Sequence, residues 1–307
     1  MMTTEQPGEG SSRRRPARRP GTTTAPGAAT GSNSSRAARG RNESESPQPT
    51  TPGRGHASWE LRIFRLAGER PRLPLEAVGE VTAVWRRALL SRADQPVAEA
   101  ISGHAPGSTP ESPRPSPRPH LALLPLADVG HRLAASDLVG MAAALPRCLQ
   151  PEERSACLVA LERVPSLTLG RLREWRLDRS DGQDGRQALE PASWIRPAHI
   201  WASVTPVVLG RYPRKPWGEE AQQILREACA IAGLPEPVAV ETAPVGWVLG
   251  VPSASRFPPL PARAGKPRRF HVHARLVFAE AVAGPVLVGA GRHQGYGFLQ
   301  QLVEGDE

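Results

Sequence analysis

Apolar and polar residues follow strand-like and helix-like periods in turn along the first half of the chain. Residues 59–66 (WELRIFRL) alternate between apolar and polar side chains, as a half-buried strand does. Residues 73–93 place Leu, Val and Trp side chains three and four positions apart, which is typical of an amphipathic helix. The later segments predict strands at 120–131 and 137–146, a helix at 151–164, and a strand or hairpin at 167–179.

The second half of the chain repeats this order loosely. It predicts a strand at 200–209, a helix at 218–234, strands at 237–244 and 268–280, and a degenerate helix with a final strand within 284–302. The order β-α-β-β-α-β is that of a ferredoxin-like unit. We therefore expect an α+β protein with two tandem ferredoxin-like (RRM-like) domains, at residues 58–180 and 195–303.

Residues 1–57 differ in composition from the rest of the chain. They are rich in Pro, Gly, Ser, Thr and Arg and contain almost no large apolar side chain, so they cannot bury enough surface to offset their conformational entropy. We expect a disordered tail. Its RRRPARRP run could add non-specific affinity for a polyanion, or could be upstream sequence without an essential role. The tail's nine arginines and four glutamates give +5 of the chain's net charge of +9, so the foldable part is only mildly basic.

The cysteines and the apolar runs exclude several classes of protein. Cys148, Cys157 and Cys229 show no CxxC spacing, so we expect neither a disulfide framework nor a zinc site, and no metal or cofactor. No apolar run approaches the roughly 20 residues that span a bilayer, and the basic N-terminus lacks the apolar region of a secretory signal. These features favour a cytoplasmic protein that has no membrane partner.

Five glycines crowd the segment GPVLVGAGRHQGYGF at residues 284–298. Glycine inside an element costs roughly 0.5–1 kcal/mol relative to alanine, so the cluster indicates special backbone dihedrals or the close approach of another group. That group is either a phosphate-bearing ligand or a neighbouring helix. For the first alternative, the candidate binding residues are Gly289, Gly291, Arg292, His293, Gly295, Tyr296 and Gly297.

Two neighbouring features carry further candidate binding residues. The run GKPRR at residues 265–269 offers Lys266, Arg268 and Arg269 to phosphates, or forms a solvated loop. His271 and His273 alternate on one predicted strand, so both side chains point to the same face of the sheet. They either face a ligand or are histidines whose hydrogen bonds are satisfied within the sheet.

An ordered series of motifs resembles the RAMP superfamily of CRISPR-associated RNA-binding proteins. The similarity is greatest to the C-terminal part of the fused RAMP subunit of subtype I-U (I-G) interference complexes, and it covers about residues 59–300. In chain order the motifs are SGH (102–104), PHLALLPLADVGH (119–131), WASVTPVVLGRYP (201–213), SRFPPLP (255–261), GKPRRFHVHARLVF (265–278) and the glycine-rich segment.

The resemblance implies an endoribonuclease that processes CRISPR RNA (crRNA). The family's subunit cleaves precursor crRNA repeats without a metal ion, remains on the repeat-derived handle and assembles with the other subunits of the complex. Precursor and mature crRNA are the implied partners, and the glycine-rich segment would contact the RNA. In that subunit an N-terminal RAMP module caps the other end of the crRNA, and here residues 1–57 stand in its place. The alternatives for this module are that it is encoded separately, lost, or missing through truncation or misannotation, so the capping role is not assigned to this chain.

Metal-independent cleavage requires proton transfer, for which histidine is suited by its ordinary pKa near 6.5. A base activates the ribose 2′-OH, an acid protonates the leaving 5′-oxygen, and a 2′,3′-cyclic phosphate results. Among the eight histidines, we select His104, in a long polar loop, and His131, where a strand gives way to a turn with Asp137 beyond it. The alternatives are a loop cap for His104 and a solvated turn residue for His131. His120, at the start of a strand, is expected to be structural.

Two other classes of function stay open at this point. One is a non-catalytic RAMP subunit that holds crRNA without cutting it. The other is a metal-dependent enzyme, for which the sequence offers the HVH motif at 271–273 but no HExxH. Alanine substitution of His104 and His131 separates the first alternative from catalysis, and cleavage in excess EDTA tests the second.

Overall fold

The computed structural model describes most of the chain after the tail. The described residues are 58–67, 72–109, 112–170, 174–182, 185–215, 217–260 and 269–302. They all lie within one compact unit, residues 51–307. The expected disordered tail, residues 1–57, lies outside the described residues, as do Lys266 and Arg268.

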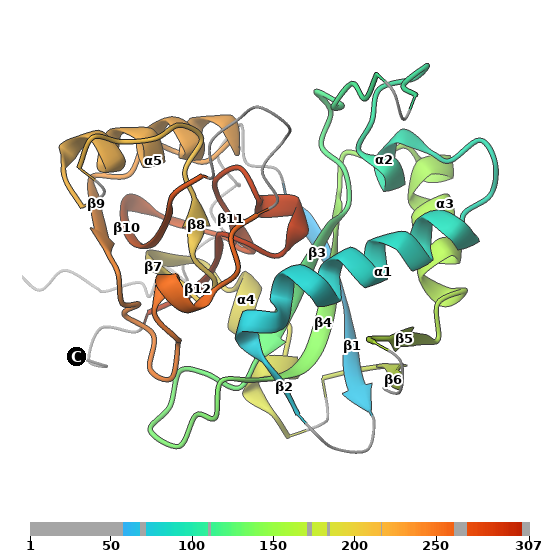
Figure 1. Ribbon diagram of the computed structural model, residues 1–307, viewed down its shortest axis with the longest axis horizontal. Coiled ribbons are helices and arrows are strands. Elements are labelled where there is room, and N and C mark those ends of the chain that lie inside the picture. Colours follow the sequence, from blue (N-terminus) through green and yellow to red (C-terminus); the bar gives the residue numbers. More distant parts are fainter. Residues whose placement is uncertain are drawn as a thin grey trace, which may run out of the picture. The chain divides into compact units, whose positions relative to one another are not determined.

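The first antiparallel sheet has the predicted order of elements (Figure 1). The main elements of this first half are β1 (Trp59–Ala67), α1 (Val78–Arg92), β3 (Ala122–Ala127), β4 (Asp137–Pro146), α3 (Pro151–Glu162) and β6 (Glu174–Arg179). The strands pair in the order β3-β4-β1-β6. The first strand thus lies between the third and the fourth, as in a ferredoxin-like unit. The shorter elements are β2 (Leu73–Pro74), η1 (Leu75–Ala77), α2 (Glu99–Ser102), β5 (Ser166–Thr168), η2 (Gln187–Leu189) and α4 (Ala192–Ile195).

Local sequence accounts for the two long helices of this half. Pro151 occupies the first turn of α3, and the side chains of Gln150 and Glu153 form a reciprocal capping box at its start. Helix α1 turns one apolar face to the sheet, where the ring of Trp85 packs edge-on against Phe64 at 5.6 Å between centroids. The fully buried apolar residues of that face are Val78, Val81, Trp85 and Leu89.

The second half of the chain repeats this topology, except that its second helix is replaced by a loop. Its main elements are β7 (Ala198–Ser203), α5 (Glu219–Ile231), β9 (Ala239–Ala243), β10 (His271–Val282) and β12 (Phe298–Gln301). The strands pair in the order β9-β10-β7-β12, again with the first strand between the third and the fourth. In place of the second helix stands a glycine-rich loop with β11 (Val286–Leu287) and the short helix η4 (Arg292–Gln294). The predicted α+β fold class with paired ferredoxin-like units and a degenerate last helix is confirmed.

The predicted strand at 200–209 is interrupted in the structure. It is divided into β7 and β8 (Val207–Val208), and both pieces pair with β10. Pro206 lies in the interruption, and proline has no backbone N–H with which to continue a ladder. Its carbonyl accepts the Gly297 N–H at 2.9 Å, so the interruption joins this strand to the glycine-rich loop.

The two sheets share an apolar core. Trp85 and Phe64 of the first half and Tyr296 and Phe298 of the second belong to the same buried cluster. The ring of Trp194 stacks on that of Phe298 with centroids 4.5 Å apart. The predicted domain limits, 58–180 and 195–303, stay predictions. Among the described residues, no helix is both long enough and apolar enough to cross a bilayer.

Candidate active site

Three histidines from distant parts of the sequence meet where the glycine-rich loop packs on the first half. The imidazole rings of His120 and His293 are stacked, with centroids 3.8 Å apart and planes 22° apart. His104 lies close enough to His120 for its charge to contribute to lowering the pKa of His120. We call His104, His120 and His293 the histidine cluster. It joins a residue predicted to be catalytic, one predicted to be structural and one predicted to bind RNA.

The loop between α2 and β3 brings His104 and His120 together. His104 pairs with Pro115 in an isolated bridge, which folds the loop back on itself. Gly103, directly before His104, has a φ of +65°, and a Cβ at that position would lie 2.8 Å from the His120 ring. Only glycine meets both conditions without strain. The glycine of the SGH motif therefore allows the backbone beside His104 to lie against the His120 ring.

A backbone hydrogen bond assigns the protonation of His120. The distance from its Nδ1 to the Arg118 carbonyl oxygen is 3.2 Å. Because a carbonyl can only accept, Nδ1 must carry the hydrogen, and in the neutral ring Nε2 is then the unprotonated acceptor. Burial is the main cause that lowers the pKa of His120, and the positive charges of Arg86 and Arg292 add to it. The neutral ring therefore predominates at pH 7, with Nε2 available to take a proton.

His293 lies in η4, which the glycine-rich loop holds against α1 and β3. The Thr82 hydroxyl donates to the Gln294 carbonyl at 3.0 Å. Gly295 has a φ of +81°, and a Cβ there would lie 2.7 Å from a Val78 methyl group. Burial is the first cause that lowers the pKa of His293 to about 2, followed by the charges of His120, Arg292 and Arg86. The ring is therefore neutral, and its buried Nδ1 has no hydrogen-bond partner.

Two arginines place positive charge beside the histidine cluster. Arg86 on α1 donates to the Ser102 carbonyl, and Arg292 in η4 donates to the Gly289 carbonyl at 3.4 Å. Both side chains are half-buried, which lowers the pKa of each. Neither forms an ion pair within the described part of the chain. Since a buried charge is costly unless it is paired, the pair of arginines favours binding of an anion.

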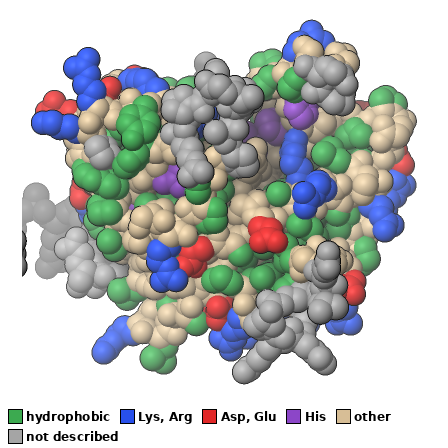
Figure 2. Space-filling view, in the orientation of Figure 1, with side chains coloured by type: hydrophobic (Ala, Val, Ile, Leu, Met, Phe, Trp, Pro, Cys, Tyr) green, Lys and Arg blue, Asp and Glu red, His purple; other side chains and the backbone are tan. Residues whose placement is uncertain are grey.

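Histidine and basic side chains are visible together on one face of the molecule (Figure 2). Figure 2 shows histidine side chains beside Lys and Arg side chains around a hollow in the upper middle of the face in view. Among the described residues, no three His, Cys, Asp or Glu side chains are placed to hold a metal ion together. The site therefore combines two neutral, stacked imidazoles, a third histidine and two guanidinium groups that have no carboxylate partner in the described part of the chain. These are the groups that general acid–base chemistry at a phosphate requires.

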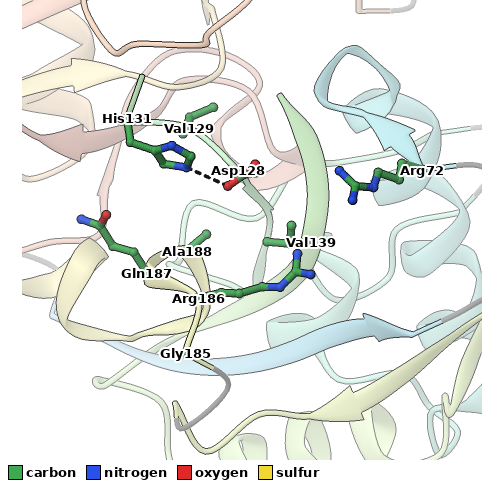
Figure 3. A pocket seen from close by; sticks show the side chains of 9 residues that line it. All are labelled: Arg72, Asp128, Val129, His131, Val139, Gly185, Arg186, Gln187 and Ala188. Carbon is green, nitrogen blue, oxygen red and sulfur yellow. Dashed lines mark hydrogen bonds and ion pairs between the residues drawn. The ribbon is translucent and has the colours of Figure 1, made fainter. Parts of the chain in front are cut away.

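His131 lies in a different pocket, of about 420 Å³ (Figure 3). Its Nε2 is 2.9 Å from Asp128 Oδ1, and Asp137 instead pairs with Arg72 at 3.2 Å. Arg72 and Arg186 line the same pocket, but no member of the histidine cluster does. The structure therefore does not bring the two predicted catalytic histidines together, and Asp128 is the carboxylate beside His131.

The glycines of the loop are explained by close packing within the protein. Gly289, Gly291, Gly295 and Gly297 are buried. A Cβ at Gly297 would lie 1.9 Å from the Val288 carbonyl oxygen, and one at Gly289 would lie 2.7 Å from the carbonyl oxygen of Val208. The packing alternative thus accounts for their positions, and their contact with RNA stays a prediction.

Three other predicted RNA-binding residues have protein partners. His273 is fully buried between the Ser203 hydroxyl and the Pro252 carbonyl, each 2.9 Å away. Tyr296 is 1% exposed, and its hydroxyl donates to the Pro258 carbonyl at 2.6 Å. His271 is half-buried, with its ring 5.3 Å from that of Tyr296. No face of Tyr296 is open for a base to stack on. Roles in RNA binding for these three residues stay predictions.

Sequence reasoning missed two members of the site. His120 was expected to be structural, although the polar loop is bounded by SGH at one end and PH at the other. That symmetry is the signal that could have found it, because a loop bounded in this way can bring its ends together. Arg86 lies on the exposed side of an amphipathic helix pattern, and nothing in the sequence distinguishes it from its neighbour Arg87.

Comparison with protein-family models assigns the chain to a family. The model of the family "CRISPR-associated protein, GSU0054 family" matches residues 58–301. The chain belongs to this family. The family confirms the predicted resemblance to CRISPR-associated proteins, whereas the RAMP superfamily and the subtype stay predictions. No curated protein matches the chain.

Several solved structures are similar to this chain at low identity. The product of a Cas6-related gene from Pyrococcus furiosus is 10% identical over 80% of this chain and 100% of its own, with a TM-score of 0.39. A RAMP protein described as binding different RNA substrates is 12% identical over 79% and 98%, with a TM-score of 0.38. Csf5, a type IV Cas6 crRNA endonuclease, is 14% identical over 79% and 98%, with a TM-score of 0.33.

Proposed function

We propose that this protein is an endoribonuclease that cleaves precursor crRNA repeats at the histidine cluster. After cleavage it stays on the repeat-derived handle, as a subunit of a type I-U (I-G) interference complex in the cytoplasm. The observation that carries the proposal is the stacked pair His120 and His293 beside two half-buried arginines that have no carboxylate partner among the described residues. Membership of a CRISPR-associated family supports RNA as the anion.

The first step is assigned to His120. Its Nε2 takes the proton of the ribose 2′-OH, and the 2′-oxygen forms a bond to the adjacent phosphorus. The bond between phosphorus and the 5′-oxygen breaks as the new bond forms. The products are a 2′,3′-cyclic phosphate and a 5′-hydroxyl. The stack with His293 restricts rotation of the His120 ring, so that Nε2 is held in one direction.

His104 and the two arginines act on the leaving group and on the negative charge that develops at the phosphate. His104, in protonated form, donates a proton to the leaving 5′-oxygen. Arg86 and Arg292 bind the non-bridging oxygens, whose negative charge increases in the phosphorane-like transition state. No metal ion takes part in this scheme.

The decisive assay follows cleavage of an end-labelled repeat RNA by the full chain in excess EDTA. His120→Ala and His104→Ala are expected to lower the cleavage rate by about 10²–10⁴-fold, the usual contribution of a general acid or base. RNA affinity should stay within about threefold of wild type. His120→Gln serves as a second variant that keeps the volume of the side chain and a polar group.

The matched control is His131→Ala, which alters a histidine in the separate pocket with Asp128. We expect it to cleave at the wild-type rate. If His131→Ala abolishes cleavage while both cluster variants retain it, the active site is the pocket that contains His131 and Asp128. If all three variants cleave normally, neither assignment is correct.

Two further outcomes separate the alternative functions. A repeat with a 2′-deoxyribose at the scissile position should bind but stay intact, because the attacking hydroxyl is missing. Wild-type chain that binds repeat RNA but never cuts it would support the non-catalytic scaffold subunit. Activity that disappears in EDTA would support a metal-dependent enzyme.

A further inference from the structure

A second surface of the protein combines exposed aromatic rings with free positive charge. Of the large apolar side chains that are exposed within the described residues, only Tyr212 and Trp217 are aromatic, with 63% and 42% of their surfaces exposed. Both rings pack on Phe270. We call Tyr212, Trp217 and Phe270 the aromatic platform. Exposing two aromatic rings in one place removes stabilisation that burial would give, which points to a ligand.

The fold holds the platform in place. Strand β8 pairs with the start of β10, and the Leu209 N–H donates to the Phe270 carbonyl at 2.9 Å. This pairing aligns the segment after β8 with the segment before β10. The Phe270 ring then contacts Tyr212 at 5.8 Å and Trp217 at 5.6 Å, with interplanar angles of 83° and 69°. The two exposed rings are therefore ordered before any ligand arrives.

Three cations are close neighbours of these aromatic residues in the sequence. Arg214, Lys215 and Arg269 are exposed, and they form no ion pair within the described part of the chain. Two carboxylates of α5 have other partners. Glu227 binds the guanidinium group of Arg211 through both oxygens, and Glu220 accepts the backbone N–H of Arg214 at 2.7 Å. The positive charge is thus free for an outside partner.

We propose that the aromatic platform binds an unpaired segment of RNA. Bases stack on the open faces of Tyr212 and Trp217, while Arg214, Lys215 and Arg269 contact the phosphates. Base faces are available only in single-stranded RNA, since in a duplex they are covered by their neighbours. A protein-docking surface would instead be depleted in lysine and other charged groups at its centre.

The platform connects to the candidate active site along the chain. His271 directly follows Phe270, and its ring lies against that of Tyr296 in the loop that carries His293. The proposal takes an RNA held at the histidine cluster to continue towards the platform. The inference rests on the proposed function in one respect: the unpaired segment is taken to flank the repeat that the cluster cleaves.

The test compares two RNA probes by fluorescence anisotropy with the full chain. One probe is a repeat with a short oligouridine extension, and the other is the same repeat without it. Tyr212→Ala and Trp217→Ala should each weaken binding of the extended probe by roughly 5- to 100-fold, as loss of one stacked base does. Both variants should bind and cleave the unextended repeat like wild type. Tyr212→Phe and Trp217→Phe keep an aromatic face and should bind both probes normally.

The control is Ile231→Ala, which removes an apolar side chain that is 71% exposed but lies outside the platform. It should change neither affinity. Salt dependence gives a second readout. The triple change Arg214→Gln, Lys215→Gln and Arg269→Gln should reduce the slope of log affinity against log salt by roughly 0.7 for each lost phosphate contact.

The outcomes distinguish this proposal from the proposed function. Loss of the extension's effect in the platform variants supports the platform even if the wild-type chain never cleaves RNA. Normal cleavage with unchanged affinity of the platform variants for both probes overturns the platform and leaves the nuclease proposal standing. The same unchanged RNA affinity, together with a failure of those variants to assemble with a protein partner, would also overturn it in favour of a protein contact.

Discussion

One hydrogen bond gives His120 a defined chemical role. The Arg118 carbonyl requires the hydrogen on Nδ1, so the lone pair is on Nε2. Burial, together with the charges of Arg86 and Arg292, lowers the pKa of this ring below its ordinary value of 6.5. Such a base is unprotonated throughout the neutral range and becomes protonated only in acid. His293, stacked on it, is held neutral for the same reasons.

The pH dependence of cleavage tests this account of His120. We expect kcat/KM on repeat RNA to rise with pH along a limb whose apparent pKa lies below 6.5, where the base loses its proton. Arg86→Gln removes a nearby positive charge, so it should move that limb to higher pH and lower the rate. Arg87→Gln, at the exposed neighbouring position, is the control and should leave the limb in place. An acid limb that Arg86→Gln does not move would show that His120 is not the titrating base.

At the scale of elements, the glycine-rich loop replaces a helix of the second ferredoxin-like unit. Its glycines allow β11, η4 and β12 to lie directly against α1 and β8. Gly297 has a φ of +63° and touches the Val288 backbone, and Gly295 faces Val78 with a φ of +81°. A regular helix would need more room between the sheets than these contacts allow. The loop therefore fixes the place of His293 through backbone packing.

Alanine substitutions of glycines measure this packing. Gly297→Ala combines a positive φ with a backbone clash and should lower the free energy of unfolding by about 2 kcal/mol or more. Gly170→Ala, at a φ of +68° with no atom of the described residues within 4 Å of the added Cβ, should cost only ~1 kcal/mol. Gly210→Ala, where the added Cβ likewise meets none of the described residues, should change stability by less than about 0.5 kcal/mol. Urea denaturation gives all three values, and equal losses at the three sites would contradict the packing account.

At the scale of the whole molecule, neither ferredoxin-like half contains the candidate site. His104, His120 and Arg86 come from the first half, and Arg292 and His293 come from the second. The hydrogen bond from Thr82 to the Gln294 carbonyl and the shared apolar core hold the halves together. Loss of this packing would separate the stacked rings without changing either sheet.

Buried neutral histidines tie the stability of the folded state to pH. His273 is fully buried, and burial lowers its pKa to about 4, below the value near 6.5 of the unfolded chain. Between these values the unfolded state binds more protons, so the folded state loses stability as pH falls from about 6.5 to 4. For this residue the loss is about 3 kcal/mol.

The His273→Gln variant checks this prediction. It should be less stable than wild type at pH 7, because the hydrogen bonds with Ser203 and Pro252 are altered. Its free energy of unfolding should fall less steeply between pH 6.5 and pH 4, since the titrating group is gone. Denaturant unfolding at both pH values measures the difference. Parallel curves for the two proteins would show that His273 titrates alike in the folded and unfolded states.

The sequence by itself determined the elements whose pattern is local. The alternation in 59–66 and the proline and glutamates that open the helix predicted at 151–164 correspond to β1 and α3, since burial of one face and capping depend on neighbouring residues. The order of elements then favoured the ferredoxin-like units, and the ordered motifs indicated the family. The strand predicted at 200–209 was incorrect in its continuity, because Pro206 has no backbone N–H with which to continue the ladder. The hydrogen bond of its carbonyl to Gly297 is a feature of the tertiary structure.

Only the tertiary structure decided which side chains share a site. His120 and His293 stack although a large part of the chain separates them, and nothing in the local pattern of either residue records the other. His104 lies near them. His131, which was predicted to be catalytic on the same grounds as His104, lies instead in a pocket with Asp128. Periodicity reports which face of an element is buried. The meeting of two loops is set by how α1, β3 and η4 pack, and that depends on contacts throughout the core.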